Sequence, residues 1–191
     1  MSEDFNLTPK QQTALAEARR CADIAFRETG FWPTLLVAEW VLASKWGTDQ
    51  PGNNPFRVKY APHVHRWGWQ SLASHECVLA GQLEDFRREH PEAKVLSDRL
   101  NGAILEVSAT VAFAAYPSLV EAFVDRARLY QFVAPYCHVW QMLKDEESPL
   151  EFLRVISGAD ERGARQAAKL ERIIEGLRLE AGDELRGHSE G

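Results

Sequence analysis

Between Pro33 and Gly47 the chain reads PTLLVAEWVLASKWG. Proline in the first turn of a helix and glycine just past its end are typical helix boundaries. Apolar residues cover nearly every face of the helix that this pattern predicts, and Glu39 is its only acid. A helix that is apolar on all sides is buried at the centre of a domain. The segment therefore predicts a central buried helix from Pro33 to Trp46.

The residues around this helix predict more helices. Thr8 is a good N-cap with Pro9 after it, and Gly30 ends the apolar periodicity that follows, so a long first helix precedes the central one. Further helices are expected at residues 69–88, 133–144 and 160–179 and after two capping boxes, Ser118–Glu121 and Ser148–Glu151.

One small β-hairpin is expected among the helices. Asn101-Gly102 is a strong hairpin turn signal, and it separates residues 95–100 from the alternating apolar residues of 103–113. The fold class is therefore mainly α (α+β), a single domain with a central buried helix and one small β-hairpin. Residues 1–180 are expected to form this domain, and residues 181–191 a disordered tail.

The composition excludes several classes of partner. A formal net charge of -6 argues against nucleic acid, which is bound by clustered lysine and arginine. The sequence contains no apolar run of the roughly 20 residues that a membrane span needs. The polar, acidic start shows no signal peptide, so we expect a cytoplasmic protein or one exported by a signal-independent route.

Three ordered segments resemble the motifs of the bacterial glucosaminidase family, which hydrolyses the β-1,4 bonds of peptidoglycan glycan strands. The family's Leu-Glu-Ser-x-Trp-Gly motif is matched at Leu42, Ser44, Trp46 and Gly47. Its Asn-x-Phe-Gly-Ile-Lys motif is matched at Asn54, Phe56 and Lys59. Its Phe-Arg-x-Tyr motif, followed by a helix, is matched at Phe113, Tyr116, Ser118 and Asp125.

This resemblance implies a lysozyme-like fold with a glycan-binding groove. The groove residues it implies are Ala43, Asn54, Phe56, Asp98 and Tyr116, with Glu39 at or just under the floor. Asp98 stands nearest to the second acidic residue that the family has before the hairpin turn.

The sequence departs from the family at positions that matter for chemistry. Ala43 occupies the place of the glutamate that serves the family as general acid. Arg57 replaces the glycine of the second motif, and Ala114 replaces the arginine of the third. The family's late Gly-Tyr-Ala-Thr-Asp-Pro segment is not recognisable. Because a methyl group has no proton to give, we expect a protein without measurable hydrolytic activity.

Glu39 leaves two interpretations open. It lies four residues before Ala43, on the same face of the helix, where an apolar environment would raise the pKa of a carboxyl group and suit it to be a substitute acid. Alternatively, it is a structural buried acid paired with an arginine or with the backbone.

Aromatic and histidine residues follow in the segment PHVHRWGW. Trp67 and Trp69 could stack on sugar rings or anchor the loop to the core, and the sequence favours neither. His63 and His65 could chelate a metal, but no third ligand is evident, so a loop pair is favoured and no metal or other cofactor is expected.

Three functions remain open at this stage. The first is an N-acetylglucosaminidase whose parent carries glutamate at position 43. The second is a pseudoenzyme that binds peptidoglycan, a related glycan or a protein partner. The third is a scaffold protein that keeps only the fold. Several altered motif positions favour divergence over one introduced change, and the intact Asn54, Phe56 and Tyr116 favour a retained cleft.

Overall fold

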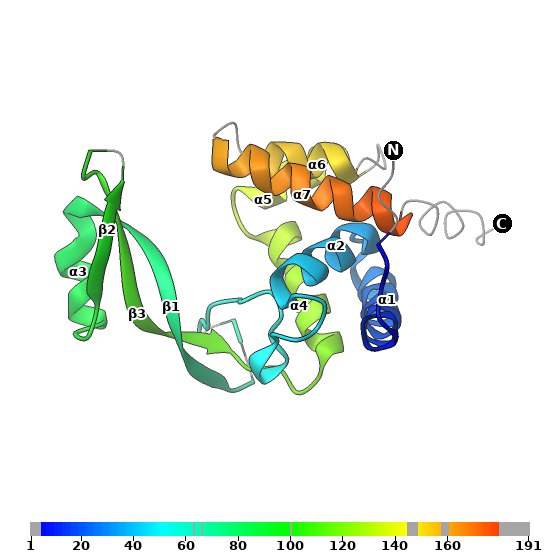
Figure 1. Ribbon diagram of the computed structural model, residues 1–191, viewed down its shortest axis with the longest axis horizontal. Coiled ribbons are helices and arrows are strands. Elements are labelled where there is room, and N and C mark those ends of the chain that lie inside the picture. The colour runs from blue at the N-terminus through cyan, green and yellow to red at the C-terminus, as the bar shows by residue number, and fades with distance from the viewer. Residues whose placement is uncertain are drawn as a thin grey trace. The chain divides into compact units, whose positions relative to one another are not determined.

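The computed structural model describes residues 5–62, 64–65, 67–99, 101–144, 149–157 and 161–179, with the side chains of 161–163 left out. The chain divides into two compact units. The helical unit comprises Met1–Phe56 and Tyr116–Gly191, and the sheet unit comprises Arg57–Ala115. Each unit is described separately below, with the element labels of Figure 1.

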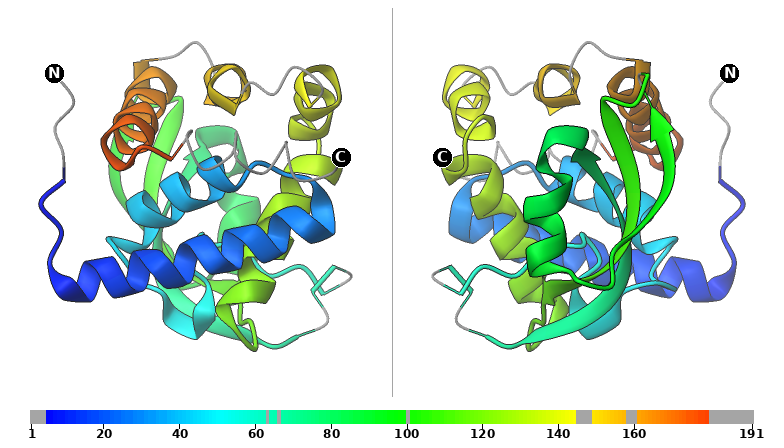
Figure 2. Two further views of the ribbon diagram at one scale, coloured as in Figure 1. Left: turned by 90° about the vertical axis from the view of Figure 1, so that its right-hand side faces the viewer. Right: turned by 90° about the vertical axis from the view of Figure 1, so that its left-hand side faces the viewer.

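The helical unit is built from helices around a single buried one. Its elements are α1 (Pro9–Thr29), α2 (Pro33–Ser44), the 3₁₀ turn η1 (Pro51–Asn53), α4 (Leu119–Phe132), α5 (Tyr136–Leu143), α6 (Pro149–Ser157) and α7 (Glu161–Leu177). Figures 1 and 2 show α2 between α1 on one side and α6 and α7 on the other.

The predicted central helix is confirmed, although it ends at Ser44 and not at Trp46. Nine residues of α2 are buried, and Glu39 is partly buried among them. Aromatic rings pack around the start of α2: Phe31 and Trp32 contact Trp140 of α5 and Phe152 of α6 at centroid distances of 4.7 to 5.6 Å. This packing fixes α2 as the axis on which the rest of the unit is arranged.

Both predicted ends of α1 and the predicted start of α4 are also confirmed. Thr8 caps α1 in a reciprocal capping box with Gln11, and Gly30 ends the helix at φ 73°. Ser118 caps α4 by accepting a hydrogen bond from the Val120 N–H. The helix expected at 133–144 begins later, at Tyr136. Ser148 and the expected tail at 181–191 lie outside the described residues.

The sheet unit is a three-stranded antiparallel sheet with one short helix on it. The strands β1 (Trp69–Leu79), β2 (Lys94–Arg99) and β3 (Ile104–Ala114) lie in the order β1-β3-β2. The 3₁₀ turn η2 (Ala80–Gln82) and α3 (Leu83–Glu89) connect β1 to β2, and α3 lies along one face of the sheet (Figures 1 and 2). Its Leu83 and Phe86 pack on the cluster formed by Val78, Ala93, Val107, Ala109, Val111 and Phe113.

The predicted hairpin is confirmed as β2 and β3, but the helix expected at 69–88 is wrong over most of its length. Residues 69–79 form β1, which pairs with β3 from Trp69 opposite Ala114 to Leu79 opposite Ile104. Exposed and less exposed side chains alternate along it, which is the period of a half-buried strand. Its Ala, Leu, Gln and Glu residues suit a helix locally, so long-range pairing with β3 decides the conformation. Only the end of the expected helix is helical, in α3.

Within the described ranges, no helix combines the length and the apolar character that crossing a membrane requires.

Candidate functional site

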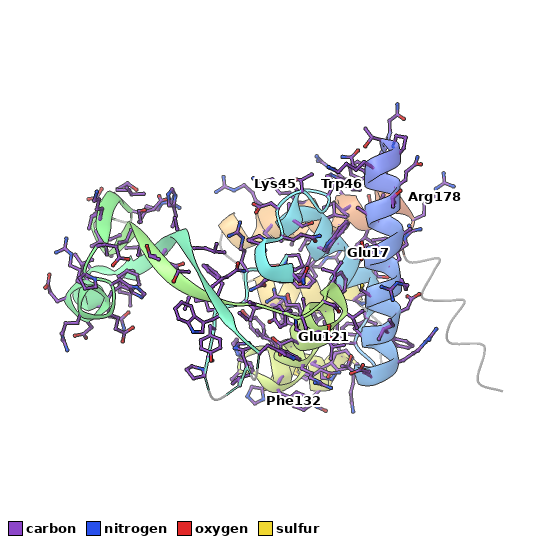
Figure 3. All side chains as sticks on the ribbon, turned by 90° about the horizontal axis from the view of Figure 1, so that it is seen from below. Glu17, Lys45, Trp46, Glu121, Phe132 and Arg178 are labelled. Atoms are coloured by element: carbon purple, nitrogen blue, oxygen red, sulfur yellow. The ribbon has the colours of Figure 1, made fainter. Side chains whose placement is uncertain are left out.

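The first motif forms the end of α2. The Ser44 side chain is buried, and its hydroxyl donates to the Trp40 carbonyl at 2.6 Å while accepting from the Gly47 N–H at 2.8 Å. Lys45 and Trp46 follow with positive φ angles of 50° and 62°, which turn the chain out of the helix. Figure 3 shows both residues just beyond α2. Ser44 therefore stops the helix at a fixed place.

Gly47 completes this stop because no side chain fits there. Its φ is 80°, a conformation that glycine adopts without steric cost. A Cβ atom at this position would lie 2.9 Å from Cζ2 of Trp40 and 3.3 Å from Cβ of Ala14. The motif glycine is thus explained by packing between α1 and α2.

Position 43 lies in the last turn of α2, directly before this stop. Ala43 is half-buried, and its side chain is a methyl group. The residues that define the motif around it serve to end the helix, whereas position 43 itself carries no group that transfers protons.

Glu39 adopts the second of its two predicted arrangements, an ion pair with an arginine. Arg126 of α4 donates from Nε to Oε2 at 2.9 Å and from Nη2 to Oε1 at 2.8 Å, a two-point contact. The Tyr130 hydroxyl also donates to Oε1 and accepts from Arg126 Nη2 at 2.7 Å. Only 13% of the Glu39 side chain is exposed. Both carboxylate oxygens are engaged in holding α2 to α4.

The groups around Glu39 keep their donor forms. Burial opposes the charge on Arg126, but the Glu39 carboxylate outweighs burial and raises the pKa of Arg126. Burial and the same carboxylate raise the pKa of Tyr130 well above its ordinary value. The arginine therefore stays charged and the phenol stays protonated, which suits a structural network.

Residues at the second and third motifs lie side by side in the helical unit and are joined by hydrogen bonds. The Asn53 amide donates to the Tyr116 carbonyl at 3.0 Å, and the Tyr116 N–H donates to the Gly52 carbonyl at 2.9 Å. Asn54 is fully buried, and Phe56 packs against Phe123 of α4 at a centroid distance of 5.0 Å. The predicted groove residues Asn54 and Phe56 are thus buried supports, and their contact with glycan stays a prediction.

Tyr116 is buried as well. Its hydroxyl donates to the Asp125 carboxylate at 2.6 Å, which joins the third motif to α4. Burial first, and the hydrogen bond to Asp125 second, raise the pKa of Tyr116 well above its ordinary value. The phenol is therefore a fixed donor to Asp125.

The backbone conformation at Arg57 accounts for the glycine that the glucosaminidase motif has at this position. Its φ is 54°, in the left-handed region where a side chain meets the backbone. The chain keeps the turn that glycine would make and accepts the strain of a larger residue.

The sheet unit contains a carboxylate that the sequence analysis did not select, Glu76 of β1. The motif residue Lys59 donates to it from Nζ at 2.6 Å, and the Ser74 hydroxyl donates to it at 2.6 Å. Its side chain is 15% exposed. Burial alone would raise the pKa of Glu76, but the bonds from Lys59 and Ser74 outweigh burial and lower it. Glu76 is therefore a well-positioned, ionised carboxylate.

The other predicted site residues of the sheet unit are more open. Asp98 is exposed on β2, opposite Leu105 of β3. Trp67 is partly buried, and Trp69, the first residue of β1, is 57% exposed. Asp98 and Ala43 belong to different units, so their joint action stays a prediction.

The histidine pair is described only in part, because His63 lies outside the described residues. His65 is buried, and its Nδ1 accepts a hydrogen bond from the Ala61 N–H at 2.8 Å. No group of three or more metal-binding side chains occurs among the described residues. Nδ1 of His65 thus has a structural role.

Similar proteins were found by structure. No protein-family model matches the sequence, and no curated protein matches it either. The catalytic domain of the autolysin Auto from Listeria monocytogenes is 17% identical, with 92% of this chain and 88% of that chain covered and a TM-score of 0.62. A C-terminally truncated glycoside hydrolase domain of FlgJ from Salmonella typhimurium is 21% identical, with 88% and 97% covered and a TM-score of 0.59. A mutant peptidoglycan hydrolase from Sphingomonas sp. A1 is 21% identical, with 93% and 99% covered and a TM-score of 0.57.

The chain has the fold of these hydrolase domains. It is the mainly helical, lysozyme-like fold that the resemblance to the glucosaminidase family implies, with a small antiparallel sheet. Sequence identities near 20% show a shared fold and do not show a shared activity.

Within this fold, the sequence did hold a signal for Glu76. The segment 69–79 contains a single acid, and Lys59 of the second motif is a natural partner for it. The signal was missed because 69–79 was interpreted as a helix, in which Glu76 is one polar residue among several. In a strand, the same residue lies on the less exposed face with Leu72 and Val78.

Proposed function

We propose that this protein binds peptidoglycan glycan strands with a glucosaminidase-type fold and does not hydrolyse them. The observation that carries the proposal is the end of α2. The Ser44 and Gly47 contacts hold position 43 at the end of that helix, and the residue there is Ala43. Glycoside hydrolysis needs a carboxylic acid that protonates the leaving oxygen, and a methyl group cannot replace it.

Glu39 does not compensate for the missing acid in this proposal. A substitute acid must turn a protonated oxygen toward the substrate. The oxygens of Glu39 instead accept hydrogen bonds from Arg126 and Tyr130. Freeing Glu39 for catalysis would break the contact that joins α2 and α4, so its role is structural.

Within the sheet unit, Glu76 meets the chemical demands on a second carboxylate of glycoside hydrolysis better than Asp98 does. That role needs an ionised group to activate water or to stabilise positive charge at the anomeric carbon. Glu76 is held by Lys59 and Ser74 and has a lowered pKa, whereas Asp98 is exposed to solvent on an edge strand. We therefore propose Glu76, and not Asp98, as the second carboxylate.

Two assays test this function. Purified peptidoglycan sacculi should retain the protein in a sedimentation assay, and their turbidity should stay constant with the natural chain. Ala43→Glu should produce lysis, because restoring general acid catalysis contributes about 10²- to 10⁴-fold to the rate. Adding Glu76→Gln to that variant should abolish lysis, and adding Asp98→Asn should leave it.

Several outcomes decide between the alternatives. Lysis by the natural chain, lost on Glu39→Gln, would make Glu39 the acid and overturn the proposal. No binding to sacculi would also overturn it and would favour a protein partner. Lysis by the Ala43→Glu variant that survives Glu76→Gln but not Asp98→Asn would return the second role to Asp98.

A further inference from the structure

We infer that Trp69 is the stacking platform of a sugar-binding subsite, supported from behind by Tyr60 and His65. The inference deepens the proposed function and rests on it, because it names the surface that holds one N-acetylated pyranose ring. It places a binding element in the sheet unit, separate from the residue that decides hydrolysis.

The indole of Trp69 is open to solvent to an extent unusual for tryptophan. It is 57% exposed, although tryptophan is mostly buried on average. Its partner across the ladder is Ala114, and the next pair on the same face is Ser71 with Ala112. These neighbours have short side chains, so they leave the ring uncovered.

Two aromatic rings extend from Trp69 into the unit. The rings of Tyr60 and Trp69 lie 6.4 Å apart with an angle of 36° between their planes. The rings of Tyr60 and His65 lie 5.8 Å apart and are stacked at 27°. Separations in this range are typical of interacting aromatic pairs.

Hydrogen bonds fix the positions of these rings. The Tyr60 N–H donates to the Ala112 carbonyl at 2.9 Å, and the Ala115 N–H donates to the Gly68 carbonyl at 3.0 Å. His65 is held by the bond from Ala61 to its Nδ1. Residues at both ends of the loop before β1 are thereby bonded to β3 or to the residue that follows it, so Trp69 needs little ordering when a ligand binds.

A pyranose ring suits this surface better than a charged or a purely apolar ligand. The face of an indole carries partial negative charge, which attracts the polarised C–H groups on the flat side of a sugar. Hydroxyl and acetamido groups at the sugar edge can remain hydrated or bond to polar neighbours, among which Ser71 lies on the same face of the sheet as Trp69. Among the exposed apolar residues that the structure describes in the sheet unit, Trp69 is the one that combines a large flat ring with rigid support.

The test compares variants of the full chain in binding to sacculi and to the soluble N-acetylglucosamine tetramer. Trp69→Ala should weaken both by about ten- to thirtyfold, the effect of truncating an aromatic anchor. Trp69→Phe should stay within a fewfold of the natural chain. Leu79→Ala is the matched control, since Leu79 is 53% exposed at the other end of β1 and should leave binding unchanged.

Tyr60 is a positioning residue, and a second pair of variants tests it. Tyr60→Ala should weaken binding by a smaller factor than Trp69→Ala, and Tyr60→Phe should restore it, because only the ring is used. A merely structural role would instead appear as an equal loss for all ligands together with a lower melting temperature.

The outcomes separate the two proposals. If the natural chain binds both probes and Trp69→Ala binds as tightly, the subsite is wrong while the proposed function stands. If the natural chain binds neither probe, the proposed function is wrong and the subsite falls with it. Selective loss in Trp69→Ala, with rescue by phenylalanine, supports both.

Discussion

The helical unit and the sheet unit use their polar residues in opposite ways. In the helical unit, Glu39, Asn54 and Tyr116 are buried or nearly so, and the partners of Glu39 and Tyr116 are Arg126 and Asp125 of α4. In the sheet unit His65 is buried, but the ion pair of Arg99 with Glu106 lies at the surface, where 52% of the arginine side chain is exposed.

The contacts of the motif residues show that the sequence motifs identify the fold. Ser44, Gly47 and Tyr116 make the motifs recognisable because each one fastens a helix end or a turn. In our proposal, glycan binding and the lack of hydrolysis depend on other residues, Ala43 in the helical unit and Glu76 and Trp69 in the sheet unit.

The largest expected effect comes from breaking the buried ion pair. Arg126→Met leaves the Glu39 carboxylate without its cation in a poorly hydrated place, so the free energy of unfolding should fall by about 3–5 kcal/mol. Urea denaturation followed by circular dichroism measures it. Arg99→Met is the matched control in the sheet unit, and because its side chain is 52% exposed it should hardly move the midpoint. Equal shifts for both variants would contradict the comparison.

The two units should also differ in their response to alanine at a glycine with positive φ. Gly47→Ala should cost about 2–3 kcal/mol, because its Cβ clashes with Trp40 in addition to the backbone strain. Gly102→Ala has a similar φ of 84° but its nearest neighbour is Asp98 at 3.9 Å, so only the strain of about 1 kcal/mol remains. Thermal unfolding of the two variants checks which one is destabilised more. Because the two φ angles are similar, the expected difference comes from packing alone.

A smaller effect is expected from pH in the sheet unit. The pKa of Glu76 is lowered in the folded chain, so above its ordinary value near 4.5 the carboxylate is charged in both states and its stabilisation is fully present. As pH falls below that value, the unfolded chain binds the proton first, and the stabilisation is lost by the time pH passes the folded pKa. Glu76→Gln should flatten the stability profile in this acid range, and an unchanged slope would contradict the assignment.

The smallest effect belongs to Arg57, the first residue of the sheet unit. Arg57→Gly removes a side chain from a φ of 54° and should stabilise the chain by about 0.5 kcal/mol, since relief of strain is partly offset by the entropy of glycine. Differential scanning calorimetry should show a small rise in melting temperature. A fall would mean that contacts of the arginine side chain outweigh the strain.

Local signals in the sequence predicted the helical unit well. The Thr8 cap, the Gly30 stop and the apolar faces of α2 act within one or two helical turns, so they are visible without any partner. The Asn101-Gly102 turn is equally local, and it places β2 and β3 correctly.

Long-range contacts account for what the sequence did not predict. The segment 69–79 is a strand because β3 lies beside it, which its own residues do not reveal. The sequence offered an arginine partner for Glu39 as one possibility, but Arg126 is 87 residues away and no pattern singles it out. Glu76 was overlooked for the same reason, since its value depends on Lys59 and on the strand that carries it.

The way in which α2 ends has a consequence for the history of such a protein. The hydrogen bonds of the stop come from Ser44 and from the backbone, and none of them uses the side chain at position 43. The helix stop therefore does not depend on a hydrogen bond from that side chain. Alanine and glutamate codons can differ at the second base alone, so a single base change separates Ala43 from a carboxylic acid at the same place in the last turn of α2.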